Sequence, residues 1–177
     1  MKRISFKDSQ GLSLTQMVLT GRKTMTRRNT RMYEIGDVVA IQQSYKDVLA
    51  CEYLPNDKED EVCRLVSDGV PGCTNKMFVR SDLMPHHIRI TNVRCERLQD
   101  ISDEDCMRVG IEWLPDGARL KPYAFYDTRI KTQDGYGWYR DYDTPREAFA
   151  TLIDKVGGRG TWERNPMVWV YEFELVD

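Results

Sequence analysis

The sequence of 177 residues predicts one domain of the α+β class, a small mixed sheet curled into a barrel and flanked by short helices. About five or six segments have the length and apolar content of strands, and loops or single helices separate them. This alternation is too sparse for a doubly wound parallel sheet. The chain has no internal repeat and no low-complexity linker, so we expect a single domain over residues 1–177.

The first third of the chain is expected to contain one helix among short strands. Leu14, Met17 and Val18 recur at helical spacing, and Gly21 is a residue that commonly ends a helix. The expected elements are a strand over 3–6, a helix over 13–20 and strands over 25–28 and 38–41.

The second half carries clearer signals for the ends of helices. Thr144 is followed by a proline and, three residues on, by Glu147, which is the pattern of a capped helix start. Ser102 precedes three acids, as the N–H groups at a helix start favour. The expected elements are a bulged strand over 88–98, a helix from Ser102 to Gly110, a helix from Thr144 to Gly157 and a strand over 167–175.

Two segments fall outside this pattern and are expected to be insertions, at approximately 46–75 and 112–143. The first carries seven acids against three bases, and we predict a solvated excursion at one edge of the sheet.

The second insertion is rich in aromatic residues interleaved with bases. Aromatic rings rimmed by bases bind single-stranded nucleic acid by stacking, and Trp113, Tyr126 and Trp138 are the candidates for that role. The alternative is a lid without clear strands, whose rings pack on the barrel and on each other.

The formal net charge of −2 conceals a segregation of charge. The stretch from Ser9 to Tyr33 contains no acid and carries a charge of +5, so the remainder of the chain carries −7. The balance excludes a protein that coats nucleic acid through overall positive charge. A nucleic-acid contact is therefore expected to be confined to one site. The five bases of the stretch are Arg22, Lys23, Arg27, Arg28 and Arg31.

Part of this basic stretch is predicted to bind an anion. If residues 25–28 are extended, Thr26 and Arg28 face one side and Arg27 faces the other. Lys23, Thr26 and Arg28 can then converge on one phosphate or carboxylate, as a point charge, a hydroxyl and a planar fork. The alternative is a solvated strand edge, which lysine and arginine protect from pairing.

The same residues carry a resemblance to a known family. Gly21-x-Lys23-x-x-Thr26-x-Arg28 resembles the G-x-K-x-x-T-x-R signature of the ASCH family, which also follows the first helix. The resemblance covers roughly two thirds of the chain. Further matching segments are 33–38, 88–102, 144–149 and 165–170, and the last two resemble the phage and prophage type of ASCH protein.

The resemblance implies a PUA-like β-barrel with a basic cleft beside the Lys-Thr-Arg motif. It also implies RNA or a modified nucleotide as the partner. The residues expected to bind it are Lys23, Thr26 and Arg28, with Arg22 and Arg27 at the margin.

The resemblance implies an alternative, an amidohydrolase that acts on N4-acylated cytidine. In such ASCH enzymes a lysine and a threonine of the motif act with a glutamate just before a glycine; here the first two match Lys23 and Thr26. A threonine hydroxyl needs a neighbouring base to become a nucleophile, and the leaving amine needs a proton. The glutamate position is occupied by Val109, which transfers no proton, and Glu112 is a weak substitute.

Several classes of function are not indicated. The five cysteines are odd in number, widely spaced and absent from C-x-x-C pairs, so we expect neither a disulfide framework nor a metal site, and no cofactor. No apolar run approaches the ~20 residues of a membrane span, and a cytoplasmic location is expected. A third hypothesis is a phage-derived protein whose basic patch contacts another protein. The sequence leaves the oligomeric state open.

Overall fold

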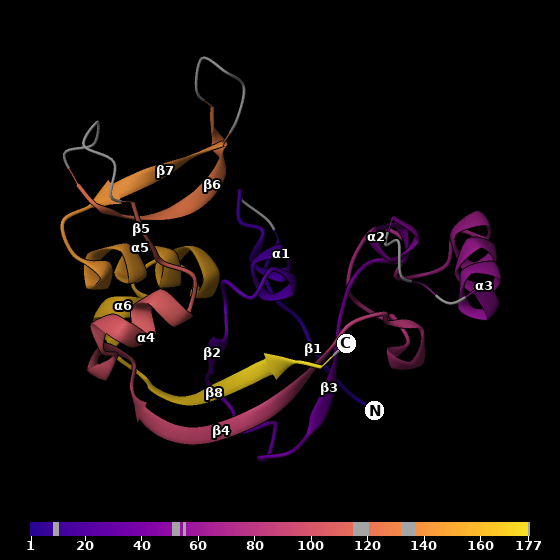
Figure 1. Ribbon diagram of the computed structural model, residues 1–177, viewed down its shortest axis with the longest axis horizontal. Coiled ribbons are helices and arrows are strands. Elements are labelled where there is room, and N and C mark those ends of the chain that lie inside the picture. The colour runs from indigo at the N-terminus through magenta and orange to yellow at the C-terminus, as the bar shows by residue number, and fades with distance from the viewer. Residues whose placement is uncertain (9–10, 51–53, 55, 115–120, 132–136, 177) are drawn as a thin grey trace.

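The computed structural model describes the backbone of residues 1–8, 11–50, 54, 56–114, 121–131 and 137–176, and all of their side chains except those of 56–57, 126–131 and 137–141. Figure 1 shows the elements along the chain. They are β1 (Lys2–Ile4), α1 (Leu14–Leu19), β2 (Met25–Arg28), β3 (Val38–Ile41), α2 (Tyr45–Leu49), α3 (Asn56–Ser67), η1 (Ser81–Leu83), β4 (His87–Arg97), η2 (Leu98–Asp100), α4 (Asp103–Arg108), β5 (Glu112–Trp113), β6 (Tyr123–Lys131), β7 (Gly137–Tyr142), α5 (Pro145–Gly157), α6 (Thr161–Arg164) and β8 (Met167–Leu175).

The main sheet has five strands in the order β1-β3-β4-β8-β2. Its centre is the long antiparallel pair of β4 and β8, which runs from Ile88 opposite Leu175 to Arg97 opposite Met167. The register shifts after Ile90, so the bulge expected in this strand is confirmed. β1 pairs in parallel with β3, and the other neighbours are antiparallel. The fold is therefore α+β with a mixed sheet, as predicted.

The prediction of a closed barrel is wrong, because β1 and β2 are the two edges of an open sheet. β1 has three residues and β2 has four, and the two strands are not paired with each other. Side chains link the two edges: Arg28 Nη2 donates to the carbonyl of Ser5 at 2.5 Å, and the hydroxyl of Tyr33, which follows β2, donates to the carbonyl of Arg3 at 2.7 Å.

The larger hydrophobic core lies between this sheet and helices α1, α4 and α5, which share one side of β4 and β8 (Figure 1). Two of these helices begin at the expected caps. Thr144 Oγ1 accepts from the N–H of Glu147, and Ser102 Oγ accepts from the N–H of Asp105. Tyr171 of β8 is the largest of the fully buried side chains that the structure describes in this core.

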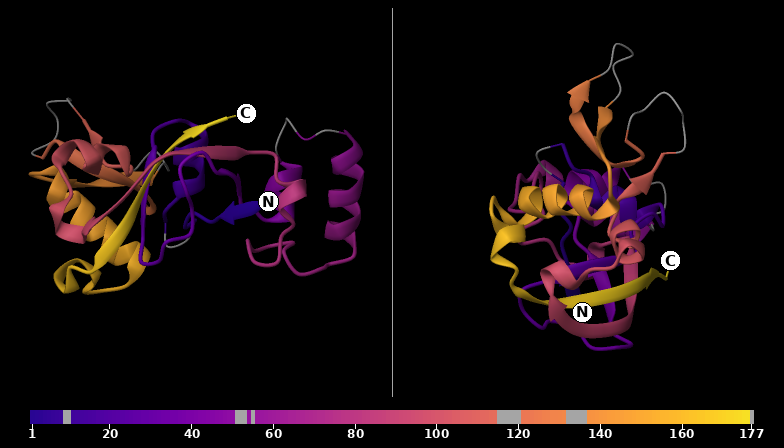
Figure 2. Two further views of the ribbon diagram at one scale, coloured as in Figure 1. Left: turned by 90° about the horizontal axis from the view of Figure 1, so that it is seen from below. Right: turned by 90° about the vertical axis from the view of Figure 1, so that its left-hand side faces the viewer.

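Residues 46–75, expected to be an insertion, do not form the solvated excursion that the sequence predicted. They contribute α2 and α3 to a second core, formed by Ala40, Tyr45, Val48, Val62, Cys73, Val79, Leu83 and Met84. The acids of this insertion mask an apolar stripe on α3, where Val62, Leu65 and Val66 recur at helical spacing. Figure 2 shows α2 and α3 at the opposite end of the molecule from α4, α5 and α6.

The insertion at 112–143 also contains regular structure, contrary to the prediction of a lid without clear strands. β5, β6 and β7 form a separate three-stranded antiparallel sheet. Phe125 is 1% exposed within the larger core, and its ring stacks on that of Tyr142 with centroids 5.8 Å apart. Phe125 of β6 and Tyr142 of β7 thus join this sheet to the larger core.

Candidate functional site

A cleft of about 340 Å³ lies where the motif meets the first helix and α5, and we refer to it as the basic cleft. Segment 5–7 forms one wall, β2 another, and α5 closes the apolar side. Among its lining residues four are basic and none is acidic. They are Ser5, Phe6, Lys7, Leu14, Lys23, Thr26, Arg27, Arg28, Val109, Phe149, Leu152, Ile153 and Val156.

Lys23 is 5% exposed and lies in the turn between α1 and β2. Its Nζ donates to the carbonyls of Met25 at 2.8 Å and of Val109 at 2.9 Å. Burial, followed by the positive charges of Arg28 and Arg27, lowers the pKa of Lys23 from 10.5 to about 7. Two N–H groups of Lys23 Nζ are donated to these carbonyls. The remaining site on the nitrogen carries a third N–H when the side chain is protonated, below about pH 7, and a lone pair when it is neutral.

Two other cations of the cleft are also held by backbone carbonyls. The guanidinium of Arg28 lies over the ring of Phe6, 5.8 Å from the centroid, and donates a hydrogen bond to the carbonyl of Ser5. Lys7 Nζ donates to the carbonyl of Lys155 at 2.6 Å and to that of Val156 at 3.3 Å, near the C-terminus of α5. Carbonyls satisfy hydrogen bonds without cancelling a full charge. In the described part of the chain, none of Lys7, Lys23 and Arg28 pairs with a carboxylate, so their positive charge is uncompensated.

Arg27 differs from these three because its charge is neutralised. Its side chain is 2% exposed, and Nη2 lies 2.9 Å from Glu96 Oε1 and 3.3 Å from Asp105 Oδ2. The guanidinium also lies 5.5 Å from the ring centroid of Phe149. It was predicted at the margin, facing away from Thr26 and Arg28. It lines the cleft, but its guanidinium is committed to ion pairs between β2, β4 and α4.

Arg22 and Glu112 pair with each other at the surface. The distance from Arg22 Nη1 to Glu112 Oε1 is 3.1 Å, and Arg22 is exposed. Neither residue is among those that line the basic cleft. Val109 contacts Lys23 through its backbone carbonyl, which accepts a hydrogen bond but transfers no proton.

Thr26 and the apolar wall complete the cleft. Thr26 is 7% exposed and lies opposite Tyr171 of β8. It belongs to β2, as Arg28 does. Of the residues that α5 contributes to the cleft, Phe149 and Leu152 are buried, and Ile153 and Val156 are half-buried. The cleft therefore combines cations with apolar side chains that lie in contact with them.

The predicted stacking residues lie elsewhere or outside the described side chains. Trp113 is 56% exposed on β5 and is not among the residues that line the cleft. The side chains of Tyr126 and Trp138 lie outside the described residues. Base stacking by these three rings stays a prediction.

Sequence reasoning missed the contribution of segment 5–7. Lys7 and Phe6 reach the cleft because β1 ends at Ile4 and the chain then crosses in front of β2. A single lysine after a short strand carries no signal of its own, and only the arrangement in space brings it to Lys23.

Neither metal nor membrane features emerge from the described residues. Their His, Cys, Asp and Glu side chains form no group of three or more that could hold a metal ion. Among the helices of the same residues, none combines the length and apolar character of a membrane span.

Comparison with known proteins gives distant likenesses only. No family model and no curated protein matches the chain. A crystal structure of a DUF984-family protein from Enterococcus faecalis V583 is similar with a TM-score of 0.40 and 14% identity, covering 93% of this chain and 67% of the other. An ASCH domain from Lactobacillus crispatus JV V101 gives 0.37 and 11%, covering 92% and 69%. At TM-scores this low neither likeness carries an argument about function.

Proposed function

We propose that the protein binds a nucleotide, free or within RNA, in the basic cleft. One observation supports this most strongly: three nearly buried or half-buried cations, Lys7, Lys23 and Arg28, are held by carbonyls and lack a neutralising carboxylate among the described residues. Buried charge without a counter-charge is costly, and an anion entering the cleft would remove that cost.

The rest of the cleft favours a nucleotide over a simple anion. Phosphate oxygens are acceptors for the ammonium of Lys23 and the planar fork of Arg28. The half-buried side chains of Ile153 and Val156 on α5 offer an apolar surface to a flat base. A volume of about 340 Å³ suits one nucleotide and not a duplex. The resemblance to the ASCH family points to the same class of partner.

Titration calorimetry with cytidine 5′-monophosphate and with a short single-stranded RNA tests this proposal. Lys23→Met keeps the volume of the side chain and removes the charge, so we expect binding to weaken by about tenfold or more. Binding should also weaken as salt increases, because phosphate contacts release counterions. For the RNA, whose phosphodiesters do not titrate in this range, affinity should rise from pH 8 to pH 6, since Lys23 gains its proton near pH 7.

The matched control is Lys2→Met, which removes an exposed lysine paired with Asp37 outside the cleft. It should leave affinity unchanged. Absence of binding at low salt, or equal affinity for wild type and Lys23→Met, would contradict the proposal.

The low pKa of Lys23 favours a second candidate, the hydrolysis of N4-acylated cytidine. A lysine that is half neutral near pH 7 can take a proton, and Thr26 lines the same cleft. Thr26 Oγ1 would attack the acyl carbon while its proton passes to Lys23, which would return it to the departing N4 of cytidine. Water would then release the acyl group from Thr26.

Incubation with N4-acetylcytidine, with chromatography for cytidine, tests the second candidate. Turnover should rise with pH through about 7, opposite to the pH dependence of phosphate binding. Thr26→Val and Lys23→Met should each abolish it. Nucleotide binding without any release of cytidine would leave the first function and exclude the second.

A further inference from the structure

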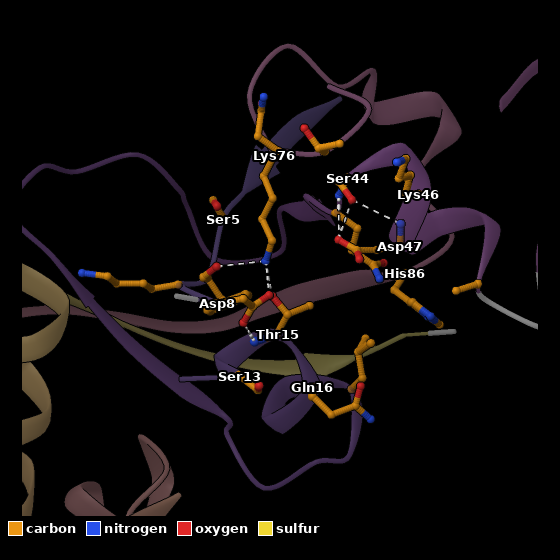
Figure 3. A pocket seen from close by; sticks show the side chains of 17 residues that line it. Ser5, Asp8, Ser13, Thr15, Gln16, Ser44, Lys46, Asp47, Lys76 and His86 are labelled. Carbon is orange, nitrogen blue, oxygen red and sulfur yellow. Dashed lines mark hydrogen bonds and ion pairs between the residues drawn. The ribbon is translucent and has the colours of Figure 1, made fainter. Parts of the chain in front are cut away.

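A second cavity, of about 930 Å³, opens between α1, the start of α2 and segment 74–76. Figure 3 shows polar side chains converging on it from both sides. It lies where the two hydrophobic cores meet, and we refer to it as the polar cavity. No motif of the sequence points to it.

The charged groups on one wall of the polar cavity bond to one another. Lys76 Nζ donates to the carbonyl of Phe6 at 3.0 Å and to Thr15 Oγ1 at 2.5 Å, and it pairs with Asp8. Asp8 Oδ1 in turn accepts from the N–H of Thr15 at 2.9 Å, so it caps α1 from outside the helix. These charges fix the wall and leave little net charge for a guest.

The opposite wall is organised in the same way. Ser44 Oγ donates to Asp47 Oδ2 at 2.6 Å and accepts from the N–H of Asp47 at 3.2 Å, which forms the capping box of α2. Both carboxylates that line the cavity are thus engaged within the protein. A guest would meet the two further cations of the lining, Lys7 and Lys46, together with neutral donors and acceptors.

Two of the neutral polar groups are not used by the fold. Ser13 precedes α1, but its hydroxyl makes no capping bond because Asp8 supplies the capping oxygen. Gln43 is 7% exposed, and its Oε1 is enclosed without a hydrogen-bond partner among the described residues. Buried amides without partners are rare. A half-turn of the amide exchanges oxygen for nitrogen, so Gln43 can offer a guest either a donor or an acceptor.

The two cavities share segment 5–7 as a common wall, since Ser5, Phe6 and Lys7 line both. The carbonyl of Ser5 bonds to Arg28 and that of Phe6 bonds to Lys76, so the segment separates the basic side from the polar side. Lys7 retains a third N–H at this boundary.

We propose that the polar cavity binds the nucleoside next to the one whose phosphate lies in the basic cleft, so that the protein holds two consecutive nucleotides of single-stranded RNA. This inference rests on the proposed nucleotide binding. Ribose hydroxyls and base edges are neutral hydrogen-bond donors and acceptors. They could therefore bond to the hydroxyl of Ser13 and the amide oxygen of Gln43, which the fold leaves without such partners among the described residues. The linking phosphate would pass Lys7.

Calorimetry with cytidine 5′-monophosphate, a dinucleotide and a trinucleotide of RNA tests the inference. The dinucleotide should bind about tenfold more tightly than the mononucleotide, and the trinucleotide should add little. The double variant Ser13→Ala/Gln43→Met should lose this gain and keep the affinity for the mononucleotide. Gln43→Met is close in volume, and Ser13→Ala removes no capping bond, so both variants should fold.

The control Ser67→Ala removes an exposed hydroxyl of α3 outside the cavity lining and should change neither affinity. If the mononucleotide binds and the dinucleotide binds no more tightly, the second site is refuted while the basic cleft stands. Equal losses for both ligands in the double variant would refute it as well. If no nucleotide binds, the proposed function fails and the second site fails with it.

Discussion

At the scale of single residues, Lys23 is the side chain whose charged form costs the fold stability while the proposed ligand binding requires that charge. The fold encloses its ammonium beside two guanidinium groups and offers only carbonyls in return. The charged form is therefore destabilising, and this is reflected in a pKa of about 7. Such a group is expected where a ligand supplies the missing charge.

The pH dependence of stability follows from this shift. Unfolded, Lys23 titrates near ~10.4. Between about pH 7 and that value the unfolded chain holds more protons than the folded one, so the free energy of unfolding rises with pH. Burial raises the pKa of Cys106 to about 12, which acts in the opposite direction above ~8.5, the usual pKa of a thiol. The window for measurement is therefore pH 7 to about 8.5.

Denaturant titrations of wild type and Lys23→Met across this window measure the effect. The difference between the two should grow in favour of wild type by at most about 1.4 kcal/mol per pH unit. Other titrating groups are common to both proteins and cancel in the difference. A difference that is constant with pH would show that Lys23 has an ordinary pKa in the folded state.

At the scale of elements, the helices that begin at Ser102 and Thr144 were predicted, whereas α2 and α3 were not, although α2 also begins at a capping residue, Ser44. Thr144 and Ser102 each predict a helix start because their hydroxyls can accept a bond from a free N–H group of the first turn, and both capping bonds are present. α3 has weak local signals, and its stripe of Val62, Leu65 and Val66 becomes informative only once a second core is known. Long-range packing decided the structure there, as it often overrides propensity.

The cap of α5 gives a prediction at this scale, because the helix carries the apolar wall of the basic cleft. Thr144→Ala removes the acceptor for the N–H of Glu147 and should lower the free energy of unfolding by about 1 kcal/mol. Thr144→Ser keeps the oxygen and should cost less. Denaturant titration measures both variants, and equal losses would mean that the methyl group, not the hydroxyl, matters.

At the scale of the whole molecule, the enclosure of the motif was not predictable from the sequence. Lys23, Thr26 and Arg28 line one cleft, but so does Arg27, which an alternating strand was expected to turn away. That these residues bind an anion stays a prediction. The sequence could not show that β1 stays apart from β2, because closure depends on pairing between distant segments. Segment 5–7 and the side chain of Arg28 lie between these two edges and line the basic cleft there.

β3 joins the two hydrophobic cores. Val39 and Ile41 belong to the larger core, while Ala40 between them belongs to the core of α2 and α3. Alternate residues of a strand face opposite sides, so one strand serves both cores. Among the described residues the smaller core has eight that are buried, few enough that α2 and α3 should open without unfolding β4 and β8.

Hydrogen exchange with Val62→Ala tests this division. Val62 is fully buried in the smaller core, and its loss should destabilise α2 and α3 by about 2 kcal/mol. Exchange should accelerate in these helices and stay unchanged in β4 and β8. The matched variant Val170→Ala removes the same two methyl groups from the larger core and should accelerate exchange throughout. Equal acceleration of β4 and β8 by both variants would mean that the two cores unfold as one unit, because local opening of α2 and α3 could not transmit a loss to the central strands.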